Sequence, residues 1–427
     1  MSQNIISVRE YARLTTKEVG LNSLDQAQVS PSAFEYLCEL SASLNRSGAA
    51  LIQQDGYQAL KLDNYVGVIE TPCGTRLEIL PKHTQQDGCL TESRRLLQRM
   101  IHAALHLPTR EVGAAELMLF DAPLSEWVMR QFLEALDYLL KRGLRFDYRR
   151  VEEEQRFLRG QLNTVAQMRQ PPGRQHYFQL RHDIFLPDRP ENRLLKLALE
   201  KICKTTQEPG NWRLAHELRS LLLEIPGSSN VRLDLSRWQD DRLMAHYKPI
   251  RPWCELILGE QSPVSVAGQW QGISLLFPME RLFEQYVEVL LRQHLLSDAV
   301  LLAQRSSHSL CTHQAAPLFQ LKPDLLLQHG ETKWVLDTKW KLLDETDRAR
   351  KYGLSQSDFY QLFAYGQRYL AGTGELILIY PQTETFTKPL EPFYFSSELT
   401  LWVMPFDLNT GALIGYKPGF GPVLPLG

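Results

Sequence analysis

The spacing of apolar residues divides the chain into stretches with different expected secondary structure. Residues 1–91 contain β-branched and aromatic residues in alternation, as in YQALKLDNYVGVIETPCGTRLEILPKH, which is typical of strands. The turn residues Pro72-Cys73-Gly74 interrupt this run, so we expect a β-rich region that ends in a hairpin. Within it, SPSAFEYLCELSASL has a helical period, and Ser32 is its candidate N-cap.

Residues 92–265 have apolar positions that repeat every three or four residues, as in TESRRLLQRMIHAALHL, APLSEWVMRQFLEALDYLLKRG and PENRLLKLALEKIC. We therefore expect a mostly helical middle region, with a domain boundary near residue 265. Residues 266–427 then change in character. The segments PMERLFEQYVEVLLRQHLL, AVLLAQ, LFQLKPDLLLQ, ETKWVLDTKWKL, LSQSDFYQLFAYGQRYLAG and ELILIYP predict the order αβββαβ. The chain is thus expected to be a multi-domain α/β protein.

Composition narrows the class of protein. The 427 residues are 44% hydrophobic and 22% charged, as in ordinary globular proteins of two or three domains. A net charge of -2 excludes a uniformly basic nucleic-acid binder but allows a local basic surface. Six cysteines form no CxxC pair, and neither a signal peptide nor a membrane span is evident, so we expect a cytoplasmic protein with reduced thiols. No GxxxxGK[ST] motif occurs, so nucleotide binding by a P-loop is not expected.

The middle region contains a local basic segment. Between Lys141 and Ile184 the sequence contains ten Lys or Arg and only five acidic residues, with aromatic residues interleaved. This segment has two interpretations. It is either a surface that binds the DNA backbone or a protein partner, or a solvated face on which Arg and Glu pair with each other.

Two carboxylates lie inside segments that otherwise indicate buried strands, in LKPDLLLQHGETKWVLDTKW. If Gly330 is the first position of a two-residue type II′ turn, Asp324 lies opposite Asp337 with Cβ atoms about 5 Å apart. Lys339 then leaves the sheet from the same face. A turn centred one residue earlier would instead place Asp324 opposite Val335.

Opposed carboxylates repel, so the pKa of one should rise unless a cation lies between them. Mg²⁺ would satisfy both with oxygen ligands. The Thr338 carbonyl could add a ligand, and Glu284 could approach from the preceding helix, although Glu280 lies on nearly the same helix face. With Lys339 orienting water or stabilising charge, this arrangement suits metal-assisted phosphodiester hydrolysis. The alternative is a solvated strand face with a chance Asp-x-Lys triplet.

The next helix places Gln361 and Tyr365 on one face, where they could contact the metal-bound water or a phosphate. In the alternative interpretation, Tyr365 is half-buried core and Gln361 a surface residue. Ser355 and Asp358 have the spacing of a capping box at the start of this helix.

These motifs resemble a known family. PD-x(12)-DTK, after a Glu-bearing helix and before Gln-x-x-x-Tyr, is similar to the RecB-like branch of the PD-(D/E)xK nuclease superfamily. The segments MERLFEQYV, LKPDLLL, VLDTKWK and SDFYQLFAYGQRY resemble the McrC subunits of McrBC-type restriction systems, and FLRGQLN and DRPENRLLKLAL resemble two landmarks upstream of the nuclease domain.

The resemblance implies a Mg²⁺-dependent DNA endonuclease subunit of an antiviral, 5-methylcytosine-dependent restriction system. Its core would occupy residues 266–427, with residues 1–91 docking on a partner and residues 92–265 as a scaffold that contacts DNA. The implied partner is a hexameric AAA+ GTPase that recognises methylated double-stranded DNA, and that the subunit stimulates.

In this resemblance, the metal ligands are Asp324 and Asp337, and Lys339 is the catalytic lysine. Glu284, Gln361 and Tyr365 complete the site. Two alternatives are a non-catalytic regulatory subunit of an AAA+ partner and a free-standing nuclease.

Overall fold

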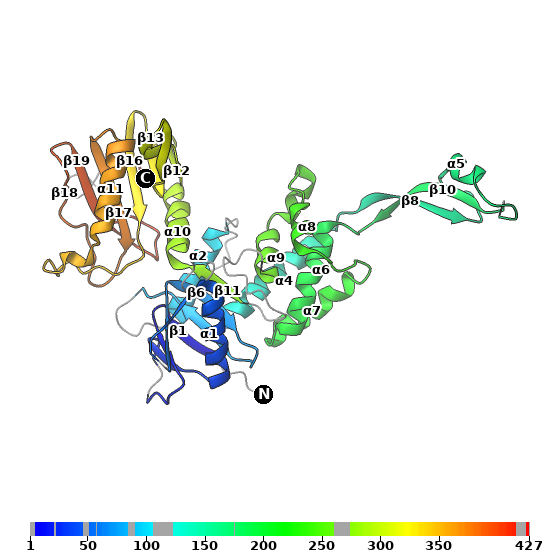
Figure 1. The fold of residues 1–427 in the computed structure, drawn as a ribbon, viewed down its shortest axis with the longest axis horizontal. Helices are drawn as coiled ribbons and strands as arrows, with labels where there is room; N and C mark the ends of the chain where they lie inside the picture. The colour runs from blue at the N-terminus through cyan, green and yellow to red at the C-terminus, as the bar shows by residue number, and fades with distance from the viewer. Residues whose placement is uncertain are drawn as a thin grey trace. The chain divides into compact units, whose positions relative to one another are not determined.

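The computed structural model describes residues 5–20, 23–45, 51–56, 58–83, 90–105, 123–174, 176–259, 274–415 and 424–426. The chain forms two compact units, drawn in Figure 1. The first unit combines residues 1–124 with residues 274–427, and the second comprises residues 125–273. The predicted boundary near residue 265 lies outside the described residues, and the three-part division of the chain stays a prediction.

Two four-stranded sheets form the N-terminal part of the first unit, in the orders β1-β7-β6-β11 and β3-β2-β5-β4. Their strands, with the helices that follow them in the chain, are β1 (Ile5–Arg9), β2 (Arg13–Thr15), β3 (Gln26–Gln28), α1 (Pro31–Asn45), β4 (Ile52–Gln54), β5 (Ala59–Leu62), β6 (Tyr65–Glu70), β7 (Arg76–Leu80), α2 (Leu90–Ala104) and β11 (Leu275–Pro278). The predicted hairpin is confirmed, because β6 and β7 pair antiparallel on either side of Pro72-Cys73-Gly74.

The predicted cap of α1 is wrong. The helix begins at Pro31, and the hydroxyl of Ser30 accepts a hydrogen bond of 3.2 Å from the Ala33 amide. Proline is favoured at the first helical position because its missing N–H would have no helical partner there. Ser32 therefore lies inside the first turn.

Strand β11 belongs to the N-terminal sheet although it lies far along the sequence. It pairs antiparallel with β6, placing Leu276 opposite Gly67. Gly67 has a φ of +134°, and a Cβ there would lie 1.8 Å from the carbonyl oxygen of Leu275. Only glycine permits this close approach of two backbones.

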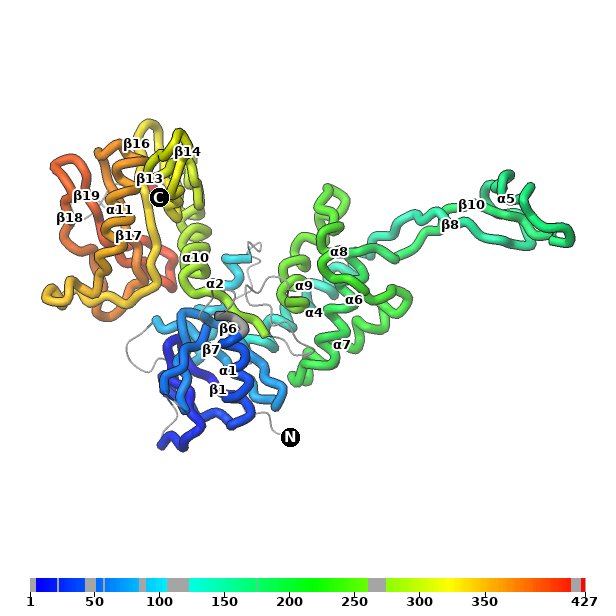
Figure 2. The backbone as a smooth tube through the Cα atoms, viewed as in Figure 1, coloured from blue at the N-terminus to red at the C-terminus, as the bar shows by residue number. Residues whose placement is uncertain are grey.

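The second unit is largely helical but contains a long antiparallel ribbon that the helical periods did not predict. Its elements are α4 (Leu124–Arg142), β8 (Asp147–Gln155), β9 (Gln161–Leu162), α5 (Thr164–Met168), β10 (Phe178–Leu186), α6 (Pro190–Thr205), α7 (Pro209–Leu221), α8 (Val231–Ser236), η1 (Arg242–Tyr247) and α9 (Arg251–Leu258). Figure 2 traces β8 and β10 as the ribbon, with α5 near its end.

Opposite charges explain why such polar segments pair as strands. Arg150 lies opposite Asp183, and Arg181 lies opposite Glu152. These pairs approach to 3.2 and 2.6 Å. Opposite charges directly across an antiparallel pair stabilise it. Part of the locally basic segment is thus paired internally, as in the Arg–Glu interpretation.

A six-stranded sheet forms the C-terminal part of the first unit, in the order β12-β15-β16-β17-β19-β18. Its elements and those around it are α10 (Met279–Gln293), β12 (Ala299–Ala303), β13 (His308–His313), β14 (Ala316–Leu321), β15 (Leu325–His329), β16 (Thr332–Thr338), η2 (Lys351–Gly353), α11 (Gln356–Tyr369), β17 (Gly374–Pro381), β18 (Phe393–Tyr394) and β19 (Leu399–Phe406). Strands β16, β17 and β19 are parallel, and the rest pair antiparallel.

The mixed α/β class is as predicted, but the strand order differs from αβββαβ. The segment expected as one strand, LFQLKPDLLLQ, is divided into β14 and β15, and β14 pairs with β13 in a separate two-stranded sheet. Pro323 lies at the division and has no N–H with which to continue a ladder.

The two helices pack on different faces of the large sheet. Leu362 and Tyr365 of α11 belong to one buried cluster with Val335 of β16. Phe283 of α10 contacts Trp340 and Phe406. Phe406 lies three residues after Val403 of the α11 cluster, so its side chain leaves β19 from the other face. Among the described residues, no helix is long and apolar enough to span a membrane.

Candidate active site

The hairpin between β15 and β16 has the predicted register. His329 pairs with Thr332, and Gly330 adopts a φ of +59°, as the first position of a type II′ turn requires. Leu325 lies opposite Leu336, so the preceding Asp324 lies opposite Asp337. Val335 pairs with Leu326, which excludes the alternative turn.

Asp337 is the most buried charged group of the site, with 1% of its surface exposed. Its Oδ2 accepts a hydrogen bond of 2.5 Å from Nζ of Lys339, and its buried Oδ1 has no hydrogen-bond partner among the described residues. Burial, followed by the charge of Asp324, raises the pKa of Asp337 to about 7. A raised pKa is the direction expected for one of two opposed carboxylates, although burial is its larger cause.

Lys339 supplies the positive charge beside this pair. Burial lowers the pKa of its ammonium group, but the carboxylates of Asp337 and Asp324 outweigh burial and raise that pKa above its ordinary value. Lys339 therefore stands as a charged hydrogen-bond donor at the carboxylates.

Asp324 is held by the strand opposite. Its Oδ2 accepts hydrogen bonds from the Thr338 amide at 2.7 Å and from the Thr338 hydroxyl at 2.8 Å. The sequence suggested only the carbonyl of Thr338, as a metal ligand, and that role stays a prediction. The hydroxyl instead fixes one carboxylate oxygen of Asp324 and leaves the other for a ligand.

The structure separates the two candidate helix acids. Glu284 accepts a hydrogen bond of 2.7 Å from Nε2 of Gln304. Burial, followed by the charge of Asp324, raises its pKa, which places Glu284 beside the pair. Glu280 is exposed, and its charge acts instead on Glu10.

Gln361 and Tyr365 come together as predicted from their spacing. Nε2 of Gln361 donates to the hydroxyl of Tyr365 at 2.7 Å, and this hydroxyl donates to the Lys322 carbonyl at 2.9 Å. Tyr365 is buried, as in the core interpretation, but it also anchors the backbone two residues before Asp324. Burial raises the pKa of its hydroxyl to about 12, so it acts as a neutral donor.

One acidic residue was not predicted as part of the site. Asp358 makes no capping box with Ser355, whose hydroxyl instead lies 2.7 Å from that of Ser357. Asp358 accepts a hydrogen bond of 3.4 Å from Tyr380. The negative charge of Asp358 also contributes to the raised pKa of Asp337, after burial and the charge of Asp324. Its spacing of three from Gln361 was the available signal, since it places both on one helix face.

The donor set fits a hard divalent cation. No three Asp, Glu, His or Cys side chains of the described ranges are grouped so that they alone could hold a metal ion. Mg²⁺ commonly binds through one or two carboxylates, with water and substrate phosphate as its other ligands. The unpartnered Oδ1 of Asp337 and the opposed Asp324 match that pattern.

Comparisons with known proteins agree with this architecture. The chain matches the family model of the "McrBC 5-methylcytosine restriction system component" over residues 60–381. A search of curated proteins gave no match.

Two solved structures share the fold. A chain of the refined half-complex from a tetradecameric assembly of Thermococcus gammatolerans McrB AAA+ hexamers with bound McrC has a TM-score of 0.72 and 18% identity, covering 96% of each chain. A chain of the cryo-EM structure of the Thermococcus gammatolerans McrBC complex has a TM-score of 0.53 and 18% identity, covering 68% of this chain and 88% of that chain.

The family match spans well over half of the sequence and includes Asp324, Asp337, Lys339 and the Gln361–Tyr365 pair. It confirms the family resemblance drawn from those motifs. The chain belongs to the family of McrBC 5-methylcytosine restriction system components.

Proposed function

We propose that this chain is the endonuclease subunit of a modification-dependent restriction complex. It hydrolyses phosphodiesters of double-stranded DNA with Mg²⁺, when driven by a McrB-like hexameric AAA+ GTPase that it also stimulates. The observation that carries the proposal is the buried Asp337, opposed to Asp324 and bonded to Lys339. Burying a carboxylate costs free energy, and carboxylates with strongly perturbed pKa values cluster at functional sites.

Each residue has a distinct part in this reaction. Asp324 and Asp337 would hold Mg²⁺, with Glu284 beside them and the Thr338 carbonyl as a further ligand. The bound ion would favour ionisation of a water molecule and offset charge on the phosphate. Lys339 orients the attacking water or places its positive charge against the phosphate.

The remaining residues support this geometry. Thr338 holds Asp324, and Tyr365 holds the backbone before it, so that both carboxylates keep their positions. Two observations support the proposal that the chain acts with an AAA+ GTPase partner. The chain contains no P-loop motif, and its fold is that of a chain in assemblies of McrB AAA+ hexamers with bound McrC.

The test is plasmid cleavage by the full chain with Mg²⁺, using methylated and unmethylated DNA, with and without the GTPase and GTP. We expect cleavage only when partner, nucleotide and methylated DNA are all present. Lys339→Ala should abolish it, while Lys333→Ala, an exposed lysine on the same strand, should cut normally.

A second readout separates the competing interpretations. Asp337→Ala should lose cleavage but still stimulate GTP hydrolysis by the partner. Cleavage by the chain alone would favour a free-standing nuclease. Stimulation without cleavage under any condition would favour a regulatory subunit.

A further inference from the structure

A cavity of about 430 Å³ lies at the start of α11, in the C-terminal part of the first unit. The loop that follows β16, the first turn of α11 and β18 enclose it. Its lining includes Arg348, Lys351, Tyr352, Gln356, Phe359 and Phe393. None of these residues takes part in the site described above.

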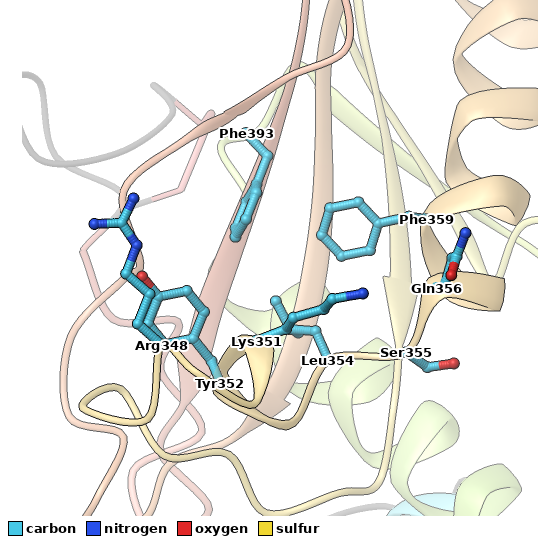
Figure 3. Close-up of a pocket in the computed structure, with 8 residues that line it drawn as sticks. All are labelled: Arg348, Lys351, Tyr352, Leu354, Ser355, Gln356, Phe359 and Phe393. Atoms are coloured by element: carbon cyan, nitrogen blue, oxygen red, sulfur yellow. The ribbon is translucent and has the colours of Figure 1, made fainter.

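Three aromatic rings form the apolar part of this cavity. Figure 3 shows the rings of Tyr352, Phe359 and Phe393 pointing toward a common space. Phe359 and Phe393 meet edge to face, with ring centroids 5.1 Å apart. All three side chains are partly buried against the core of the C-terminal sheet, so the rings are held in place. Rigid, partly exposed rings suit a planar aromatic ligand.

Two cations flank the rings. Figure 3 shows the guanidinium of Arg348 and the ammonium of Lys351 at opposite sides of the group in that view. Neither side chain forms an ion pair or hydrogen bond with the described part of the chain, whereas the neighbouring Arg350 pairs with Asp347. Their donors are therefore available to an anionic ligand.

The backbone of this loop is strained at Lys351 and Tyr352, two of the residues that line the cavity. Lys351 and Tyr352 have φ values of 55° and 58°, and Gly353 continues the left-handed turn at 86°. Such a conformation is unfavourable for side chains larger than glycine. It is retained here because Tyr352 N donates to Asp347 O at 2.7 Å and Lys341 Nζ bonds to Gly353 O. Strain kept in a well-held loop commonly marks a binding site.

We propose that this cavity binds one nucleotide of the DNA strand, with the base against the three rings and the phosphate against Arg348 and Lys351. The proposal rests on the proposed nuclease function and adds a binding site for its substrate. In sequence, the loop that lines this cavity lies between β16, which carries Asp337, and α11, which carries Gln361. Stacking requires an unpaired base, so on the double-stranded substrate the site would hold a base displaced from its pair, and it should bind single-stranded or frayed DNA more tightly than intact duplex.

Binding of a fluorescent single-stranded oligonucleotide to the full chain tests this site directly. EDTA is added to remove the divalent ion that the proposed cleavage requires, so that fluorescence anisotropy reports affinity alone. Tyr352→Gly removes one ring and also relieves the strained backbone, so it should not unfold the loop. We expect it to weaken binding about tenfold, in line with the loss of one stacking platform.

A second set of variants tests the proposed contact between Arg348 and the phosphate. Arg348→Ala should also weaken binding, and the effect should shrink at high salt because a phosphate contact is lost. Arg350→Ala is the matched control from the same loop and should bind like the unchanged chain. An oligonucleotide carrying 5-iodouracil should crosslink to the peptide that contains Tyr352.

The outcomes separate this proposal from the nuclease assignment. Unchanged oligonucleotide binding by Tyr352→Gly and Arg348→Ala would overturn the nucleotide site, even if the chain cuts plasmid normally. Equal displacement of the oligonucleotide by a polyglutamate peptide would also overturn it, in favour of an acidic protein ligand. Pocket-dependent binding by a chain that never cuts would support the site and reject the nuclease assignment instead.

Discussion

The indole Nε1 of Trp340 donates a hydrogen bond of 2.6 Å to Oε1 of Glu10, a carboxyl group 330 residues earlier in the chain. Trp340 directly follows Lys339, so one buried carboxyl group joins the N-terminal region of the first unit to the segment after β16 that carries the candidate site. The Lys82 amide donates to the same oxygen at 2.7 Å, and the other oxygen of Glu10 is buried with no hydrogen-bond partner among the residues that the structure describes.

Stability should depend on pH through Glu10. Burial raises its pKa in the folded chain from 4.5 to about 7, against hydrogen bonds and Lys82 that lower it. Between pH 4.5 and 7 the unfolded chain loses this proton and the folded chain retains it. The free energy of unfolding therefore falls with pH over this window, by roughly 3 kcal/mol at most.

Glu10→Gln should remove that part of the pH dependence. Urea unfolding at pH 5 and pH 8 would measure it, with the exposed Glu35→Gln as the control. Asp337 acts in the same direction, so the informative quantity is the difference between the unchanged chain and the variant. An identical fall in both would contradict a raised pKa for Glu10.

Glu284 and Glu280 should differ sharply in catalysis. Glu284→Gln keeps the shape of the side chain but removes a negative charge beside Asp324, so we expect plasmid cleavage to fall roughly tenfold or more. Glu280→Gln, one turn away, should leave cleavage nearly unchanged. Both are to be assayed across a Mg²⁺ titration. The reverse pattern would assign the helix acid to Glu280.

Tyr365→Phe should slow cleavage at a modest cost in stability. The change removes the hydroxyl that joins Gln361 to the Lys322 carbonyl, and we expect a loss of about 1 kcal/mol in unfolding free energy. Tyr360→Phe is the matched control, because Tyr360 makes the same type of bond with Gln356 on the exposed side of α11. Equal cleavage by the two variants would reject a positioning role for Tyr365.

Gly67→Ala should unfold much of the N-terminal sheet. The added methyl group would collide with the Leu275 carbonyl, and we expect a loss of more than about 4 kcal/mol. Gly74→Ala also has a positive φ but meets nothing within 4 Å, so it should lose only about 1–2 kcal/mol. Chemical denaturation of both variants would measure the difference, and similar losses would argue against the β6–β11 pairing.

Local patterns predicted the parts of the site that lie close together in sequence. Gly330 fixed the hairpin register, and that register alone placed Asp324 opposite Asp337. Helical spacing placed Gln361 and Tyr365 on one helix face, where the structure shows a hydrogen bond between them. The hydrogen bond from the Thr338 hydroxyl to Asp324 could not be predicted from such patterns, because a hydroxyl can reach many different acceptors from one backbone position.

Contacts between distant segments were beyond such patterns. Nothing in the sequence near Glu10 indicates that its partner is Trp340. The ribbon of β8 and β10 was not predicted, because its strands are rich in charged residues that find their partners only across the ribbon. The division of the expected strand at Pro323 was visible in principle, since proline cannot continue a ladder. Nothing in the sequence around β11 indicates that this strand pairs with β6 in the N-terminal sheet.

The position of β11 has a consequence for synthesis on the ribosome. Strand β6 emerges about 200 residues before the partner that covers its outer edge, a delay of about 10 to 40 s at ordinary elongation rates. During that interval the edge at Val66 and Val68 is open to pairing with other nascent chains. Translation speed across the intervening segment should therefore influence how much of the newly made chain reaches its native fold.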